Sequence, residues 1–420
     1  MQTIKLINYI VSAVFFVCYF YQFAYVLVPF LLKEKRENQT NEFKRYAVLI
    51  SARNESAVIG NLIKSIKRQD YPSELVDVFV VADNCDDDTA EVSRNAGAIV
   101  WERQNKELVG KGYALDYLYH KIKEEYSDKN YDGFFVFDAD NILDGKYISE
   151  MNKTFTQGYK VVTSYRNSKN YDSNWISAGY ALWFLRESKY INNSRMLLGT
   201  SCAISGTGFL VSREMLEKTN GWKYFLLTED IQFTVDTITS GECIGYSKNA
   251  VLYDEQPVKF SQSWRQRMRW SKGFYQVFNH YGNKLFMGFV KDKSFACFDL
   301  FMTIAPAIIL TSLTIIMNVI GAVVYHAKGF DASDLINMMV NSLVNMYLIV
   351  YALGFITTMT EWKQIHTTPF KKILYTFTFP IFLGTYVLIS VMALFKKVKW
   401  EPIHHSQSIS IEEMQTANAE

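Results

Sequence analysis

The stretch GFFVFDAD, Gly133–Asp140, is an apolar run that ends in two acidic residues. Its Phe and Val side chains are typical of a strand that is buried on both faces of a mostly parallel sheet. Three similar runs precede it: YAVLISA (Tyr46–Ala52), VDVFVVAD (Val76–Asp83) and GAIVWER (Gly97–Arg103). Amphipathic stretches such as Ser56–Gln69 and Lys111–Glu125 lie between these runs. The alternation predicts an α/β domain, with Ser56 and Asp86 as helix N-caps.

Acidic residues stand at the carboxyl ends of two predicted strands, where ligands bind in open sheets of this type. Asp83 ends one strand, and Asp138 and Asp140 end another. Side chains two residues apart point to the same face of a strand. Two carboxylates on one face suit Mg²⁺ or Mn²⁺ that bridges phosphate oxygens. On these residues alone, a solvated acidic turn and a capping role for Asp83 are the alternatives.

Two further motifs carry candidate chemistry. VGKGYAL places Lys111 between two glycines at a predicted helix start, where backbone amides and an ammonium group can bind phosphate. A surface lysine is the alternative interpretation. LLTEDIQF places Glu229 and Asp230 at another helix start, where a carboxylate can act as a general base. Helix capping by Thr228 and the acidic pair would also explain this motif.

The basic and aromatic stretch SWRQRMRWSKGFYQVF, Ser263–Phe278, precedes an apolar run. Gln266, Arg269 and Trp270 have spacings that can converge at a helix end or along one helix face. A guanidinium group suits a diphosphate, and an indole face suits a sugar ring. An amphipathic helix at the lipid surface is the other interpretation, and both can hold at once.

Long apolar runs near the two ends of the chain predict membrane helices. The first run, from about Ile7 to Leu32, is long enough to cross a bilayer and is followed by Lys33, Lys35 and Arg36. The positive-inside rule therefore places the middle of the chain in the cytosol. Three more runs occur near Phe295–Tyr325, Leu335–Met359 and Ile373–Phe395.

The charge rule conflicts with three simple spans at the C-terminal end. Three crossings would place Lys396, Lys397 and Lys399 outside the cell. Either one run is re-entrant or interfacial, or the rule fails here, and the sequence leaves both possibilities open.

Composition limits the remaining classes. The chain has 420 residues, of which 49% are hydrophobic and 15% aromatic, and a net charge of +2. This balance gives no field that would attract nucleic acid. The five cysteines are odd in number and scattered, which favours a reducing compartment without disulfides or structural zinc.

Taken in order, these motifs resemble those of processive family-2 glycosyltransferases, the group of cellulose, hyaluronan and bacterial poly-N-acetylglucosamine synthases. The matching segments are SARNE, Asp83 in VADN, Lys111 in GKG, DAD, SGTGF, TED and QRMRW. The resemblance covers roughly Tyr46–Phe278. It implies a cytosolic α/β GT-A (Rossmann-like) domain, an α-helical transmembrane region and inverting transfer from a UDP-sugar with Mg²⁺ or Mn²⁺.

The resemblance also implies roles for individual residues. Ala52, Glu55 and Asp83 would line the uridine pocket, and Asp230, beside Glu229, would be the general base. Asp138 and Asp140 would bind the metal, and Lys111 would contact the phosphates. Gln266, Arg267 and Arg269 would lie near the diphosphate. Trp270 would lie under the acceptor sugar, and Ser205–Gly208 would lie beside this sugar.

We expect a multi-pass plasma-membrane protein with a cytosolic catalytic domain, which transfers sugar to a growing polysaccharide and helps to translocate it. The expected acceptor is a glycan or a glycolipid. The expected divisions are 1–33 (transmembrane helix), 42–258 (GT-A domain), 259–292 (amphipathic interface helices), 293–396 (about three transmembrane helices) and 397–420 (tail). Two alternatives stay open: an enzyme that adds one sugar to a membrane lipid, and a catalytically silent membrane scaffold. The sequence does not indicate which UDP-sugar is used, nor the oligomeric state.

Overall fold

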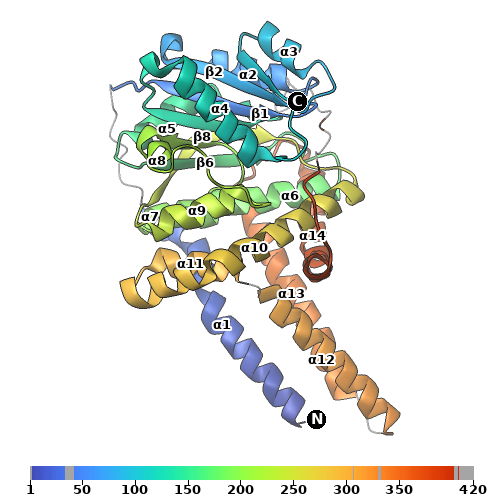
Figure 1. Ribbon diagram of the computed structural model, residues 1–420. Coiled ribbons are helices and arrows are strands. Elements are labelled where there is room, and N and C mark those ends of the chain that lie inside the picture. The colour runs from blue at the N-terminus through green and yellow to red at the C-terminus, as the bar shows by residue number, and fades with distance from the viewer. Residues whose placement is uncertain (1, 34–41, 306, 330–332, 402–404, 406–420) are drawn as a thin grey trace.

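The computed structural model describes residues 2–33, 42–305, 307–329, 333–401 and 405. Figure 1 shows an α/β domain at one end of the molecule and helices that extend from its opposite side. The predicted linker Glu34–Asn41 and the polar tail after His405 lie outside the described residues. The expected α/β domain with an adjoining helical region is confirmed.

Eight strands of the described chain form one sheet in the order β3-β2-β1-β4-β7-β6-β8-β5. Parallel pairing joins β1 with β2 and β4, β2 with β3, and β6 with β8, whereas β7 runs antiparallel to both β4 and β6. The strands are β1 (Tyr46–Ala52), β2 (Val76–Asp83), β3 (Ile99–Arg103), β4 (Gly133–Asp138), β5 (Ile142–Leu143), β6 (Val161–Ser168), β7 (Phe209–Ser212) and β8 (Ile244–Asp254).

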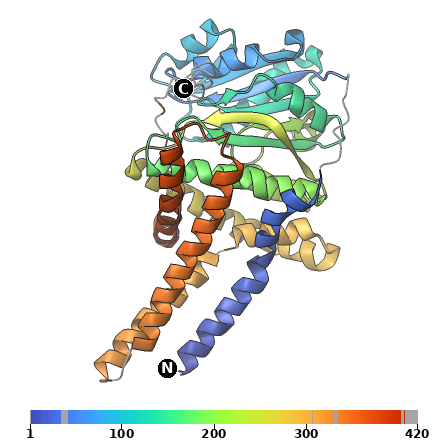
Figure 2. The same ribbon diagram turned by 180° about the vertical axis from the view of Figure 1, so that it is seen from behind.

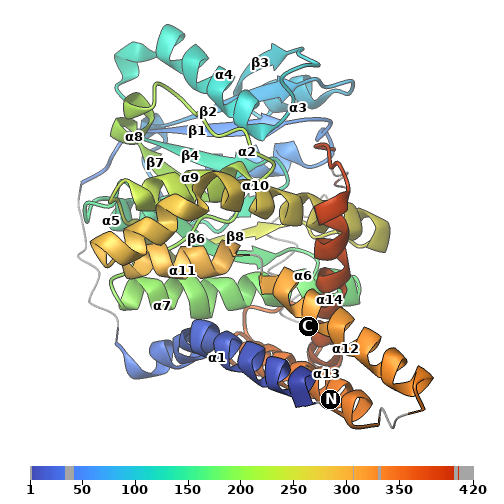
Figure 3. The ribbon, with the colours of Figure 1, turned by 60° about the horizontal axis from the view of Figure 1, so that its bottom comes forward.

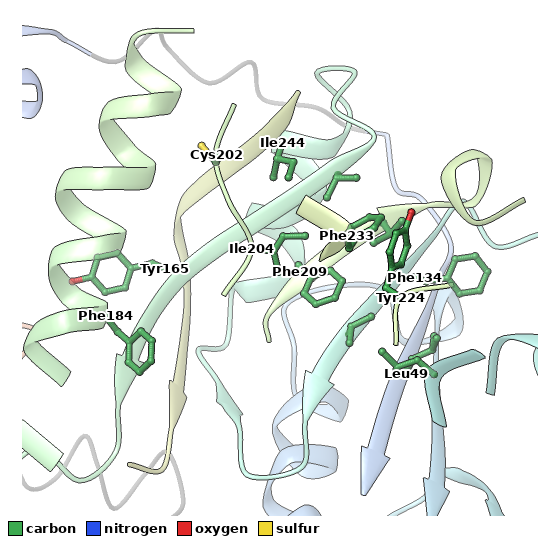
Figure 4. Packing of buried hydrophobic residues seen from close by; sticks show 14 of the residues in the cluster. Leu49, Phe134, Tyr165, Phe184, Cys202, Ile204, Phe209, Tyr224, Phe233 and Ile244 are labelled. Carbon is green, nitrogen blue, oxygen red and sulfur yellow. The ribbon is translucent and has the colours of Figure 1, made fainter. Parts of the chain in front are cut away.

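Helices cover both faces of this sheet. Successive side chains of its central strands point to opposite faces, so each strand contributes apolar side chains to the packing on both sides. In β1, Ala47 and Leu49 pack in one core cluster, and Tyr46, Val48 and Ile50 pack in the other. All five side chains are almost completely buried. Figure 4 shows the first cluster, in which Leu49 lies near aromatic side chains from other elements. Each such large apolar side chain contributes about 1.5–3 kcal/mol to folding.

The helices fall into two groups. The α/β domain contains α2 (Ile59–Lys67), α3 (Thr89–Asn95), α4 (Lys111–Glu125), α5 (Tyr147–Phe155), α6 (Trp175–Arg186), α7 (Asn193–Leu197), α8 (Arg213–Lys218) and α9 (Glu229–Thr239). The remaining helices are α1 (Gln2–Leu31), α10 (Phe260–Asp292), α11 (Phe295–Ile304), α12 (Ala307–Ala327), α13 (Ser333–Thr360) and α14 (Pro369–Phe395). A π-helical segment, Glu187–Asn192, connects α6 with α7.

The two predicted N-caps are wrong. Val58 and Asp88 occupy the N-cap positions of α2 and α3. The backbone N–H of Ser56 instead donates to the Asp87 carboxylate at 3.2 Å, which holds the loop after β1 against the loop after β2. Each helix therefore begins after this loop contact.

The helices α1, α13 and α14 are each long and apolar enough to cross a membrane. In Figure 1, α1, α12 and α13 extend away from the α/β domain, whereas α14 stays near the level of α10. Figure 3 shows α14 beside α6 and α10, and the close approach of Gly179 to the Phe382 ring agrees with this packing. The predicted group of interface helices over 259–292 is one helix, α10.

The start of α14 contacts the α/β domain and its end contacts α10. Near its start, Lys371 donates to the backbone carbonyl of Asp172 at 3.1 Å. Near its end, Lys272 of α10 donates to the carbonyl of Ala393 at 3.1 Å. His405, which follows α14 in the chain, then contacts Glu55 beyond the carboxyl end of β1. Figure 2 shows from behind that α14 stays next to the α/β domain, whereas α1 and α13 extend away from it. An apolar helix of crossing length thus begins and ends on the same side of the molecule.

A buried ionic cluster fixes α1 and α11 to the α/β domain. Arg195 of α7 donates to both carboxylate oxygens of Asp299 on α11, at 2.8 and 3.0 Å. The hydroxyl groups of Tyr21 and Tyr25 on α1 donate to the same carboxylate, at 2.9 and 2.7 Å. Every oxygen of this buried acid is satisfied, so three elements that are distant in sequence are held in one arrangement.

Candidate active site

A single cavity of about 670 Å³ runs from the carboxyl ends of β1, β2 and β4 to the helices α1 and α11. Every residue proposed for the site from the sequence lines it, except Arg267 and the second half of the Ser205–Gly208 segment, Thr207 and Gly208. The cavity walls include Ala52, Glu55, Asp83, Lys111, Asp138, Asp140, Glu229, Asp230, Gln266, Arg269 and Trp270. Motifs spread over more than two hundred residues therefore meet in one place, because the parallel strands end at the same edge of the sheet.

Asp83 and Glu55 form part of the wall at the sheet end of the cavity. Asp83 ends β2 and makes an ion pair with the neighbouring Arg103 of β3. Burial raises the pKa of Asp83, although Arg103 opposes this effect. Glu55, in the loop after β1, is also buried, and burial raises its pKa to about 7.

The segment after α14 supplies three residues to this wall that sequence reasoning did not assign. Nδ1 of His405 lies 2.9 and 3.0 Å from the two carboxylate oxygens of Glu55. The Trp400 ring lies under the Arg53 guanidinium at 5.4 Å, and Glu401 also lines the cavity. Burial would lower the pKa of His405, but Asp140 and Glu55 raise it to about 10. A tryptophan and two histidines in VKWEPIHH were the only sequence signal.

The two aspartates of the DAD motif both face the cavity, with different partners. Asp138 ends β4 and pairs with the Lys111 ammonium group, which also donates to the carbonyl of Gly206 at 2.7 Å. Asp140 lies in the following turn and accepts the backbone N–H of Glu255 at 2.8 Å. Burial alone would raise the pKa of Asp140, but the His405 and Lys169 cations outweigh it and lower the pKa.

These carboxylates fit a divalent metal that takes most of its ligands from elsewhere. No group of three or more His, Cys, Asp or Glu side chains in the described chain forms a ready metal cage. Mg²⁺ commonly binds through one or two carboxylates and completes its octahedron with water and substrate phosphates. The pair Asp138 and Asp140 suits that mode, because Asp140 stays ionised at neutral pH.

The acidic pair at the start of α9 lines the cavity, with Glu229 buried and Asp230 partly buried. Burial, reinforced by the neighbouring Asp230 charge, raises the pKa of Glu229 to about 7. Burial also raises the pKa of Asp230. A methyl group added to Gly206 would lie 3.7 Å from Oδ2 of Asp230, so the SGTG loop passes directly beside this carboxylate. A carboxyl group with a pKa near the working pH suits proton transfer.

The QRMRW motif divides between the cavity and the helix packing. Gln266, Arg269 and Trp270 line the cavity, and Arg269 donates to the carbonyl of Leu227 at 3.0 Å. The Trp270 ring packs edge-on against Tyr180 of α6.

Arg267 points to the opposite side of α10 and is completely buried. Its guanidinium donates to the Phe382 carbonyl at 3.1 Å and to the Thr385 hydroxyl at 2.8 Å, both on α14. The structure therefore does not bring Arg267 to the other predicted site residues, because residues 267 and 269 face different directions on one helix.

The cavity thus combines buried acids at strand ends, a lysine and an arginine at its centre, and an aromatic side chain next to them. This α/β sheet with its acidic pair at the carboxyl edge defines a GT-A-like glycosyltransferase. Residues 44–273 match the family described as "Glycosyltransferase like family 2". The match covers more than half of the chain, and the chain belongs to this glycosyltransferase family.

Several curated proteins are similar to the chain. A probable glycosyltransferase, YdaM of Bacillus subtilis, is 26% identical over 57% of this chain and 57% of its own length. A beta-monoglucosyldiacylglycerol synthase of Trichormus variabilis is 24% identical over 86% of this chain and 76% of its own length. A poly-beta-1,6-N-acetyl-D-glucosamine synthase of Staphylococcus epidermidis is 24% identical over 59% and 58%. The chain spans less than two thirds of the first and third relatives.

Among solved structures, the mannosyltransferase PcManGT of Pyrobaculum calidifontis, in complex with GDP-Man and Mn²⁺, has the same fold. The TM-score is 0.59 at 15% sequence identity, with 93% of this chain and 98% of that chain covered. At this identity the likeness concerns the fold, and it extends through the helical region as well as the sheet.

Proposed function

We propose that this chain is an inverting, metal-assisted glycosyltransferase that transfers a sugar from a UDP-sugar to a membrane-associated acceptor. One observation carries the proposal. The acids Asp138 and Asp140, the acidic pair of α9 and the side chains of Arg269 and Trp270 line one cavity, which continues to α1 and α11. Donor and membrane-bound acceptor can therefore meet at the same place.

Asp230 is the proposed base. Its carboxylate takes the proton from the acceptor hydroxyl as that oxygen attacks the anomeric carbon, while the bond from this carbon to the diphosphate oxygen breaks. Attack opposite the leaving group inverts the anomeric centre, and no covalent enzyme intermediate forms. The elevated pKa of Asp230 makes it a better proton acceptor than a solvated aspartate.

The leaving diphosphate gains negative charge, which the surrounding cations stabilise. Lys111, which is held by Asp138 and the Gly206 carbonyl, and Arg269, which is held by the Leu227 carbonyl, supply fixed positive charge. Asp138 and Asp140 would hold the divalent metal, which adds further electrostatic stabilisation when it is bound. Ala52, Glu55 and Asp83 would contact the nucleoside, with His405 and Trp400 beside them in the same wall.

We place the catalytic domain in the cytosol, with α1, α12 and α13 crossing the membrane and α14 lying at its surface. The support is that the start of α14 contacts Asp172 of the catalytic domain, and that His405, which follows α14 in the chain, contacts Glu55 of the same domain. With this topology, Lys396, Lys397 and Lys399 lie on the cytosolic side, in agreement with the positive-inside rule. The conflict in the sequence then disappears, because one apolar run does not cross. Residence in the plasma membrane is part of this proposal.

A growing polysaccharide, the acceptor expected from the sequence, stays a prediction. A membrane lipid that receives one sugar is the second candidate, and the exposure of the membrane helices favours it. Only 11% of the apolar window of α1 and 6% of that of α13 are buried within the chain. Membrane helices that make so few contacts with the rest of the described chain suit a lipid acceptor, which needs no enclosed path through the bilayer.

Substitution of the proposed base tests the mechanism. We expect Asp230→Asn to lower turnover by about 10²–10⁴-fold, the usual contribution of a general base, while UDP affinity stays nearly unchanged. Purified full-length protein would be assayed with radiolabelled UDP-glucose and UDP-N-acetylglucosamine, with UDP binding followed by calorimetry. Loss of UDP binding together with turnover would refute the base assignment. Product sizing separates a polymer from a single-sugar lipid.

A further inference from the structure

The cavity extends well beyond the space between the donor residues and Asp230. Its far wall consists of the end of α6, the π-helical segment Glu187–Asn192, α7, α1 and α11. The residues of this wall are Trp183, Arg186, Glu187, Ile191, Arg195, Tyr19, Gln22, Tyr25, Leu300, Met302 and Thr303. None of them belongs to the motifs used above, and we refer to this part as the far wall.

The backbone of the far wall is irregular. Glu187–Asn192 follows a π-helical path in an otherwise continuous helix from α6 to α7. π-Helical turns are rare, poorly stabilised and frequent at functional sites, because they re-aim side chains that a regular helix would place elsewhere. Here Arg186 and Glu187 at the start of the segment and Ile191 within it all face the cavity.

Arg186 is the cation of this wall that lacks a partner in the described chain. Its Nε is buried and makes no hydrogen bond, no ion pair among the described residues involves it, and the acid whose charge acts on it is the adjacent Glu187. The other two arginines nearby are neutralised: Arg195 by Asp299 at 2.8 Å and Arg166 by Asp254 at 2.7 Å. Glu187, the adjacent acid, accepts a hydrogen bond from the Ser205 hydroxyl.

Arg186 as a whole is partly buried, and the buried Nε without a partner destabilises the free protein, because the desolvation of this N–H group is not offset. The ligand that offsets it best is an anion, and phosphate matches the planar fork of arginine with two parallel hydrogen bonds. A neutral sugar would leave the positive charge unbalanced. The apolar side chains of Ile191, Leu300 and Met302 lie on the same wall, beside two helices of the membrane region. A phosphate site next to an apolar surface and beside membrane helices fits the headgroup of a lipid.

We propose that Arg186 binds the phosphate group of an anionic membrane lipid and that this lipid is the acceptor of the sugar. The inference rests on the proposed transfer reaction and names the class of its acceptor. The lipid reaches the far wall from the cytosolic leaflet beside α1 and α11, with its phosphate at Arg186 and a hydroxyl group of the same headgroup toward Asp230.

The test uses the full-length protein in micelles of a polyoxyethylene detergent, which carries neither phosphate nor sugar. Phosphatidylglycerol, undecaprenyl phosphate and neutral dioleoylglycerol are offered separately, and label from the UDP-sugar is followed into the lipid fraction. We expect transfer to a phosphate-bearing lipid. Arg186→Gln should raise the KM for that lipid about tenfold or more, the usual effect of losing a hydrogen bond to a charged group. The KM for the UDP-sugar should not change, and Arg186→Lys should be intermediate.

Arg213→Gln is the matched control, because Arg213 is an exposed arginine of α8 that does not line the cavity. Equal use of dioleoylglycerol, an unchanged lipid KM in Arg186→Gln, or a polymer as the only product would each overturn the inference while leaving sugar transfer intact. Inhibition of the wild type, but not of Arg186→Gln, by inorganic phosphate alone would show a free-phosphate site and would also overturn it. Absence of transfer to every acceptor and of UDP-sugar hydrolysis would instead refute the proposed function.

Discussion

Replacement of Lys111 by methionine should move the acidic limb of the pH–rate profile to higher pH. The pKa of Glu229 is about 7 instead of the ordinary 4.5, which corresponds to about 3.4 kcal/mol in favour of the protonated form at about 1.36 kcal/mol per pKa unit. The Lys111 cation opposes this rise at Glu229 and also lowers the pKa of Asp230. Removal of the cation therefore favours protonation of both acids.

The size of the effect follows from Coulomb's law. A unit charge roughly 8 Å away in a medium with an effective dielectric constant of about 20 contributes about 2 kcal/mol, or about 1.5 pKa units. Loss of the Lys111 partner also leaves Asp138 as an uncompensated negative charge in the same cavity, which acts in the same direction. The proposed base is active when it is deprotonated, so the rate at neutral pH should fall and recover as the pH rises.

The assay is the initial rate of UDP release by the full-length enzyme as a function of pH, at saturating donor and acceptor. Lys111→Arg keeps the charge and should keep the position of the limb, even where its amplitude is lower. Lys123→Met, at an exposed position on α4, controls for general effects of the substitution. An acidic limb at the same pH in Lys111→Met and in the wild type would refute the electrostatic reasoning.

Three further outcomes are expected. His405→Ala should weaken UDP binding about tenfold in calorimetry, since Glu55 loses its buried partner, and an unchanged affinity would remove His405 from the donor pocket. Asp140→Asn should abolish the stimulation of UDP binding by Mn²⁺, and metal-dependent binding that persists in this variant would contradict the assignment. Gly179→Ala places a methyl group 2.3 Å from the Phe382 ring and should lower thermal stability by about 1–3 kcal/mol without changing UDP affinity, as thermal unfolding of the purified protein would measure.

The sequence predicted the first strands and the location of the site because both follow local rules. β1 and β2 have the predicted limits, and α4 spans Lys111–Glu125 as expected. The apolar runs are long and the strand ends carry the acids, so the carboxyl edge of the sheet could be identified without coordinates.

Other features depend on contacts that no local pattern contains. The sequence separation between Glu55 and His405 is 350 residues, and neither flanking stretch indicates that they meet. Arg267 and Arg269 belong to one short motif, yet Arg267 is covered by α14 and Arg269 lines the cavity. Whether a helix residue faces a cavity or a neighbouring helix depends on how that helix is docked.

The return of the chain from α14 to Glu55 makes the donor pocket dependent on the membrane region. A fragment that stops after the catalytic motifs would retain every acid and the QRMRW sequence but would lack the wall formed by Trp400 and His405. Detergents that strip α14 from α6 and α10 would dismantle the same wall without unfolding the sheet. Nucleotide affinity can therefore serve as a gauge of how well the membrane helices are preserved during purification.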